Sequence, residues 1–485
     1  MQMQVAYDYE YQLAVADYWQ GRPTMEPNVW VPSLPLQMTV AVPASNTDLV
    51  VSSGGQQELK LAVMEESTEY QHERSNPMED FEKAARAFED DLQKMQTKMH
   101  LFPPSMKGEE LSKYSEPKVV SIGPYHHGKG EAIPQMESTK YAAACHFINE
   151  SGRSVEEVYG AVFAVADEAR RCYDADKLRL LSDNDFKPMM FYDGCFLLQY
   201  MLFMCRDNND EDHPIADLPW VVVDKLMKLM PKPGLDMETF VGRVKQCLQT
   251  RRHLKFDPPI LDESYKPPHL LGLLRFYIVG STDSSTTDDD SGQGLSDNAK
   301  KVSLSVSVIE LAEMGIRLTA DKTTAEINKM RVTRGWFTGK LFLPPVSLDD
   351  ANARFLVNMA AFELCITPDF GEVDDTMSTV CAYLCLLGMV TDNDTDVQEL
   401  RKKHILQGGG LTNEDALELF TGLEKHLRPG NCYYNTIVAI ENYRSDRRLW
   451  IKLYRFGYRN QTAIIAVLTT IAGIAGFLGT LKSFQ

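Results

Sequence analysis

The chain has 485 residues, of which 44% are hydrophobic, and it carries a formal net charge of −18. The hydrophobic content is enough for a large core. The negative charge repels phosphate backbones, so the composition argues against nucleic acid as a partner. The nine cysteines are odd in number, widely spaced and without a C-x-x-C pair, which does not fit a secreted disulfide framework.

The first part of the chain, residues 1–78, is irregular, acidic and interrupted by prolines. We expect a largely disordered arm here. The arm has neither a basic start nor a clean apolar core, so we do not expect a secretory signal. Apolar residues between Phe81 and Met99 then recur at helical spacing, which predicts an amphipathic helix.

Residues 79–460 are dominated by helical patterns, and we interpret them as one large, mainly α-helical domain. Further helices are expected at 137–148, 154–173, 189–205, 220–230, 237–248, 351–365, 377–390 and 413–426. Short strand patterns at 118–122, 302–308, 317–319 and 339–343 predict a minor β element. Residues 281–298 form an acidic, low-complexity stretch that we expect to be a solvated loop.

The end of the chain, residues 462–481, carries no charge. About 20 helical residues span ~30 Å, the thickness of a bilayer's hydrocarbon core. We therefore expect a C-terminal transmembrane helix in a single-pass protein of the plasma membrane, with a buried C-terminal helix as the alternative. Basic and aromatic residues at 444–459 would meet membrane lipid and favour a cytosolic body. Small residues spaced four apart in the run would permit a homo-oligomer.

Signatures of catalysis are missing from the sequence, since no H-E-x-x-H, complete phosphate loop or G-x-S-x-G occurs. His126 and His127, with Glu137 downstream, offer metal-ligating atoms, but adjacent side chains rarely reach one metal ion. Cys195 could be an activated thiol, yet its apolar neighbours favour a buried helix. We therefore predict no catalytic, metal or cofactor site, and keep a membrane-surface enzyme of unknown reaction as the alternative function.

Several segments nevertheless occur in an order that resembles the plant "domain of unknown function 247" family. The most specific segment is KVVSIGPYHHG at 118–128, and further matching blocks lie around Asp193, Ile309, Asn358 and Asp394, before the closing apolar run. These blocks supply the candidate residues, for which we favour structural roles over ligand contacts: Gly123, Pro124, Tyr125, His126, His127, Glu137, Lys140, Asp193, Gly194, Cys195, Asn358, Phe362 and Glu363.

The residue types of the first block favour a structural role. Gly123 and Pro124 end a short strand pattern and start a turn, which Tyr125 can anchor by hydrogen bonds. Glu137 and Lys140 are three residues apart on the next predicted helix, so they can pair or bond back to the turn.

The resemblance implies a membrane-associated, mainly helical plant protein without an established enzymatic activity. Some grass members are pollen determinants of self-incompatibility. We therefore expect a recognition or signalling protein that acts through an unknown protein partner, with that pollen role as the narrower possibility. The chain also departs from the family pattern, because Asp217-Leu218 leads into Pro219-Trp220 where an acidic-Asn-Gln-x-Pro element is usual. It resembles a divergent member.

Overall fold

The computed structural model describes residues 78–79, 81–83, 85–86, 95–127, 133–205, 218–231, 234–249, 259–262, 264–280, 306–321, 326–367 and 377–483. The predicted arm, except for its last residue, and the predicted acidic loop at 281–298 lie outside these ranges. The chain divides into two compact units, residues 1–89 and 90–485. In the first unit, the described positions from 78 to 86 are helical.

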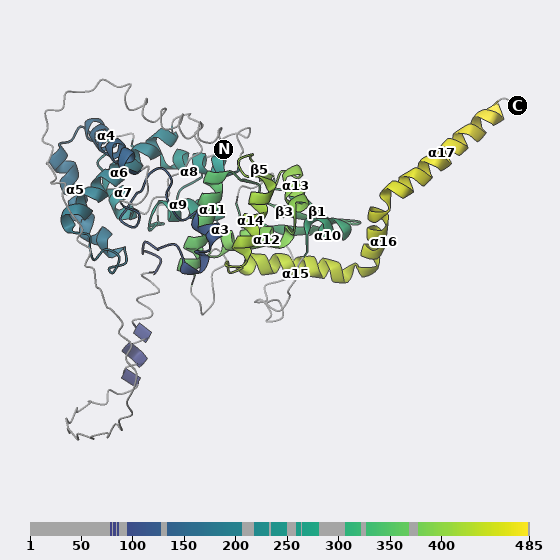
Figure 1. Cartoon of the computed structure of the whole chain (residues 1–485), viewed down its shortest axis with the longest axis horizontal. Helices are drawn as coiled ribbons and strands as arrows, with labels where there is room; N and C mark the ends of the chain where they lie inside the picture. The colour runs from purple at the N-terminus through teal and green to yellow at the C-terminus, as the bar shows by residue number, and fades with distance from the viewer. Residues whose placement is uncertain are drawn as a thin grey trace, which may run out of the picture. The chain divides into compact units, whose positions relative to one another are not determined.

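The second unit is mainly helical (Figure 1). Its first half contains η1 (Pro104–Met106), α3 (Glu109–Ser112), α4 (Ile133–Ser151), α5 (Val155–Arg171), α6 (Asp183–Cys205), α7 (Trp220–Met227), α8 (Met237–Gln249), α9 (Leu270–Val279) and α10 (Val308–Glu313). Its second half contains α11 (Asp350–Ile366), α12 (Thr379–Val390), α13 (Asp394–Lys402), α14 (Asn413–Glu424), α15 (Asn431–Asp446), α16 (Arg448–Arg459) and α17 (Gln461–Ser483). These elements confirm the prediction of a mainly helical fold.

The strands among the described residues form two small sheets. In the first, β3 (Gly339–Leu343) lies between β1 (Ile316–Ala320) and β2 (Arg331–Arg334), parallel to β1 and antiparallel to β2. In the second, β4 (Val346–Ser347) pairs in parallel with β5 (Leu406–Gln407). The strands expected at 317–319 and 339–343 are therefore confirmed.

The strand expected at 118–122 does not form, because this segment is irregular apart from a single bridge residue at Ile122. Backbone groups at the end of this segment bond to side chains of α4 and α6. The Ser121 carbonyl accepts from Lys140, and the Gly123 N–H donates to Asp193. Most of the strand expected at 302–308 lies outside the described residues, and its last residue, Val308, begins α10.

The core forms around helices that are apolar on every side. Every residue of α12 is buried, and α12 packs against α11, α14 and α15. Similarly, α6 packs against α4, α5, α7 and α8. A helix without a polar face is stable only in such an interior position, where all of its sides are buried. Around this core the amphipathic helices use local caps, such as the capping box of Thr412 and Asp415 at the start of α14.

The predicted transmembrane helix at 462–481 is the main correction. A helix, α17, does form there, but none of the helices in the described ranges is both long and apolar enough to cross a membrane. The run from Gln461 to Ala475 includes three threonines, which dilute its apolar character. The fold class is thus mainly helical with minor strands.

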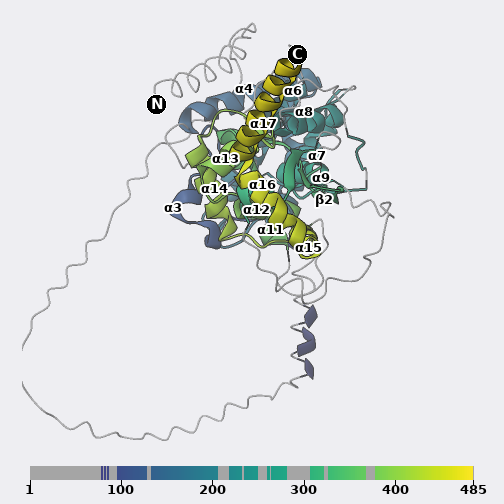
Figure 2. The same ribbon diagram turned by 90° about the vertical axis from the view of Figure 1, so that its right-hand side faces the viewer.

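The alternative of a buried C-terminal helix also differs from the structure. All described side chains of α17 are exposed, including Ile465, Leu468 and Ile471. Figure 2, turned toward this end of the chain, shows α15, α16 and α17 as three successive helices. Both α16 and α17 carry several exposed apolar side chains.

Candidate interaction surface

The signature turn at Gly123 is fixed to α6 by the carboxylate of Asp193. The backbone N–H of Gly123 donates to Asp193 Oδ2 at 2.7 Å, and Lys140 Nζ lies 2.7 Å from Asp193 Oδ1. Gly123 has a φ of 84°, a backbone conformation that favours glycine. The turn, α4 and α6 therefore meet at one buried carboxylate.

Lys140 uses its three donors in this cluster. Besides Asp193, its Nζ donates to the Ser121 carbonyl at 2.6 Å and to Glu137 Oε1 at 2.8 Å. Burial alone would lower the pKa of Lys140, but the charge and hydrogen bonds of Asp193 and Glu137 outweigh it and raise that pKa. The ammonium is thus held charged and fully bonded, which suits a structural support.

The next residues of the turn face different surroundings. The Tyr125 hydroxyl donates to the Met99 carbonyl at 2.9 Å and accepts from the Asp174 N–H at 3.0 Å. Pro124 and His126 are half-buried, and His127 is exposed. The bonds of Gly123 and Tyr125 therefore help to hold the turn in place.

Gly194 and Cys195 lie on α6 where it approaches α7. A Cβ on Gly194 would stand 2.6 Å from Leu226 Cδ1, so the glycine permits the close contact of these helices. Cys195 is fully buried, and burial raises the pKa of its thiol well above the ordinary range. A buried, protonated thiol is a poor nucleophile.

The block on α11 forms a second buried cluster. Glu363 is fully buried and its Oε1 lies 2.8 Å from both Nε and Nη2 of Arg275 on α9. Its two oxygens also accept the N–H groups of Val380 and Cys381 at 3.0 and 2.8 Å. Burial raises the pKa of Glu363, while Arg275 and these N–H groups oppose that shift. Glu363 thereby joins α9, α11 and the start of α12.

The remaining two candidates on α11 also make interior contacts. The Asn358 amide donates to the Tyr114 carbonyl at 2.9 Å and to the Arg354 carbonyl at 2.8 Å. Phe362 packs edge-on against His269, with ring centroids 4.7 Å apart. Among the candidate residues, Lys140 and Asp193 therefore form one buried cluster beneath the signature turn, and Glu363 forms another with Arg275. Within the described ranges, no three His, Cys, Asp or Glu side chains are grouped closely enough to hold a metal ion.

The exposed feature that stands out is α16, which has two contrasting faces. Ile451 is buried against the rest of the unit and Tyr454 is half-buried. Leu449, Leu453 and Phe456, which recur at helical spacing, are 84%, 63% and 64% exposed. The charged residues of α16 are all basic: Arg448, Lys452, Arg455 and Arg459.

The β2–β3 turn lies beside this helix. Its Trp336 and Phe337 are 93% and 64% exposed. Arg447 donates to the Gly335 carbonyl at 2.6 Å, and Trp450 Nε1 donates to the Phe337 carbonyl at 2.7 Å. The turn is thus tied to the start of α16. We call the exposed set the aromatic–basic surface: Trp336, Phe337, Arg448, Leu449, Lys452, Leu453 and Phe456.

The carboxyl end of α16 is held by Glu313, which ends α10 and is 8% exposed. Arg459 makes a two-pronged contact, Nε to Oε1 at 2.7 Å and Nη2 to Oε2 at 2.8 Å. Arg455 Nε lies 3.4 Å from Oε2 of the same carboxylate. A single carboxylate therefore balances only one of two guanidinium charges.

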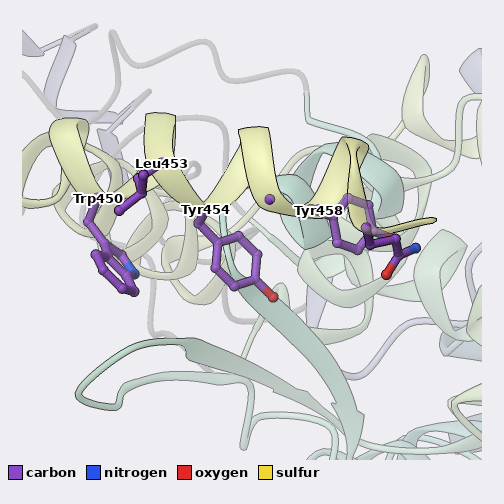
Figure 3. Close-up of a pocket in the computed structure, with 6 residues that line it drawn as sticks. Trp450, Leu453, Tyr454 and Tyr458 are labelled. Atoms are coloured by element: carbon purple, nitrogen blue, oxygen red, sulfur yellow. The ribbon is translucent and has the colours of Figure 1, made fainter. Parts of the chain in front are cut away.

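A shallow hollow runs along the face of α16 near this surface. It is lined by Trp450, Leu453, Tyr454, Gly457, Tyr458 and Gln461. Figure 3 shows Trp450 and Tyr454 projecting from the same side of the helix. Because the lining is mainly aromatic and aliphatic, the hollow suits apolar contacts better than proton transfer.

Comparison with known proteins decides the family. The sequence model of a family described as "Plant protein of unknown function", DUF247, matches residues 99–476. The chain belongs to the DUF247 family. The signature turn and both buried clusters lie within the matched DUF247 region.

Two plant proteins illustrate how far this DUF247 chain has diverged. It is 28% identical to a UPF0481 protein of Arabidopsis thaliana over 343 residues, which cover 64% of this chain and 69% of the relative. A putative UPF0481 protein of the same plant is 30% identical over 122 residues, or 25% of this chain and 21% of that relative. No solved structure matches the DUF247 chain.

Sequence reasoning missed Arg275 and the orientation of α16. Arg275 had a signal, because it is the single charge within the apolar run LLGLLRFYIV of α9. Such a charge needs a buried partner. The basic and aromatic residues of α16 were recognised, but as the flank of a membrane span rather than as a surface in their own right.

Proposed function

We propose that this DUF247 chain is a recognition or signalling protein that works at a membrane surface. The aromatic–basic surface contacts the lipid, and the helical body meets a partner protein. The observation that carries the proposal is the exposure of Leu449, Leu453 and Phe456 on one side of a helix whose charges are all basic. This combination is typical of helices that lie in the plane of a membrane interface.

The neighbouring β2–β3 turn supports the same interpretation. Trp336 is almost fully exposed beside α16, and tryptophan favours the headgroup layer of a bilayer. Exposed apolar residues continue into α17 with Ile465 and Leu468. A lipid surface would cover these side chains without requiring a shape-matched groove.

The buried clusters favour a scaffold over the alternative of a membrane-surface enzyme. Lys140 and Asp193 satisfy one another, as do Arg275 and Glu363, and Cys195 is buried within α6. Groups engaged in this way support the fold and are poorly placed to meet a substrate. A narrower role as a pollen determinant of self-incompatibility is implied by the resemblance and stays a prediction.

Vesicle sedimentation tests the proposal with the full chain. Replacing the three apolar residues of α16 by glutamine (Leu449→Gln, Leu453→Gln and Phe456→Gln) keeps good helix formers and removes the apolar face. We expect binding to vesicles of phosphatidylcholine and phosphatidylserine to weaken by at least about tenfold.

A matched control uses two apolar residues that lie elsewhere in the chain and are even more exposed. Leu180 and Ile260 are 97% and 92% exposed, so Leu180→Gln with Ile260→Gln removes comparable apolar surface. This variant should bind vesicles like the unmodified chain. Unchanged binding of the triple α16 variant would contradict the proposal.

A further inference from the structure

We infer that the lipid bound by the aromatic–basic surface is anionic, and that Arg448 and Lys452 select it; this inference rests on the proposed function and specifies its ligand. These two cations are exposed and lie four residues apart on α16, so they share one edge of the helix. That edge borders Leu449 and Phe456. Lipid phosphates would therefore meet the cations while the apolar side chains enter the acyl boundary.

The charge balance at α16 is positive. Glu313 offers one carboxylate to Arg455 and Arg459, so one guanidinium charge remains unbalanced. Arg447 donates to the backbone carbonyls of Gly335 and Trp336, which leaves its charge in place. Asp446 is the nearest acidic residue in sequence, and it pairs with Arg334. Within the described ranges, the cations on and beside α16 therefore outnumber the carboxylates that pair with them.

The negative charge of the chain as a whole contrasts with the local positive charge of α16. With a net charge of −18, the chain as a whole is repelled by an anionic membrane. The basic residues of α16 are attracted to it, so an anionic bilayer would both bind and orient the protein. A free phosphate would leave the bordering apolar side chains uncovered, which is why the geometry points to a bilayer lipid.

The ligand class is thus a phospholipid with net negative charge. Arg448 can donate to a phosphate through its planar guanidinium, and Lys452 adds a compact charge one turn later. Each basic residue near an anionic bilayer contributes roughly a fivefold gain in binding. Losing both should weaken binding by roughly 30-fold.

The experiment compares vesicles of phosphatidylcholine alone with vesicles that also contain phosphatidylserine, each at low and high salt. The full chain is tested beside Arg448→Gln with Lys452→Gln. The control is Lys177→Gln with Arg179→Gln, which removes two exposed charges between α5 and α6. We expect binding only with phosphatidylserine, weakened by salt and by the α16 variant, and unaffected by the control.

The outcomes separate the inference from the proposed function. Equal binding to both kinds of vesicle would overturn the anionic selectivity while leaving a membrane-surface role intact. Binding to neither would overturn the proposed function itself. Equal losses in the α16 variant and in the control would show a general charge effect and would overturn the assignment to Arg448 and Lys452. Unchanged circular dichroism of both variants shows that folding is preserved.

Discussion

Lys140 and Asp193 form an ion pair between α4 and α6, with Nζ and Oδ1 2.7 Å apart and both side chains 2% exposed. Such a pair is costly to break, because the partner that remains is a buried charge without compensation. Its location beneath the signature turn means that the turn depends on it as well.

Replacing Lys140 by methionine should therefore lower the free energy of unfolding by about 3–5 kcal/mol. The measurement is chemical denaturation of the full chain, followed by circular dichroism. Lys177→Met, on an exposed side chain, is the control and should change stability by less than about 0.5 kcal/mol. A loss of under about 1 kcal/mol for Lys140→Met would show that Asp193 finds another partner or is neutral.

The Arg275–Glu363 pair should behave as one unit. Either Glu363→Gln or Arg275→Met leaves a buried charge without its opposite charge, and each should destabilise the chain by about 3 kcal/mol. The double variant should lose much less than the sum, because each single change has already broken the pair. Strict additivity in this double-mutant cycle would mean that the 2.8 Å contact contributes little.

A pH dependence is expected from His269, which is buried and caps α9 by accepting the Gly272 N–H at 3.1 Å. Burial lowers the pKa of His269 from 6.5 to about 3. Between these values the unfolded chain binds a proton that the folded chain does not. Stability should therefore fall as the pH drops below 6.5, by up to about 1.4 kcal/mol per unit.

Other groups also titrate in this range, so the test compares the chain with His269→Asn. Asparagine keeps a cap acceptor but does not titrate. Denaturation midpoints at pH 7.5, 6.5 and 5.5 should converge as the pH falls, since only the unmodified chain loses the contribution of the histidine. Parallel pH profiles would show that His269 does not titrate differently on unfolding.

The thiols of Cys145 and Cys195 should react with a maleimide at different rates. Cys145 is exposed on α4, whereas Cys195 is fully buried on α6 and the pKa of its thiol is raised. A maleimide should label Cys145 rapidly and Cys195 only after denaturant is added, as read by peptide mass spectrometry. Rapid labelling of Cys195 in the native chain would revive the enzyme alternative.

The sequence predicted local relationships better than distant ones. Glu137 and Lys140 are three residues apart on one helix, so their pairing could be anticipated from spacing alone. Glu363 and Arg275 are 88 residues apart, and no local pattern links them. Likewise, the apolar run of α12 predicted a helix. It did not predict that Glu363 of α11 would cap that helix.

The C-terminal run illustrates a different limit. Its lack of charge predicted a helix correctly, yet apolar length alone led to a membrane span that the described helices do not support. Exposed faces, such as that of α16, depend on which side the remainder of the fold covers. In α16 this side is set by Glu313 and Tyr454, through contacts that the sequence of the helix does not specify.

The capping of α12 by Glu363 has a consequence for folding order. Ser378, at the N-cap position, makes no side-chain capping hydrogen bond, and two of the first N–H groups of α12 bond instead to a side chain of α11. The first N–H groups of α12 are thus satisfied by Glu363 only when α11 is docked against it, with Arg275 of α9 beside the same carboxylate. We expect these three helices to form late and together, as one cooperative step, rather than as independent nuclei.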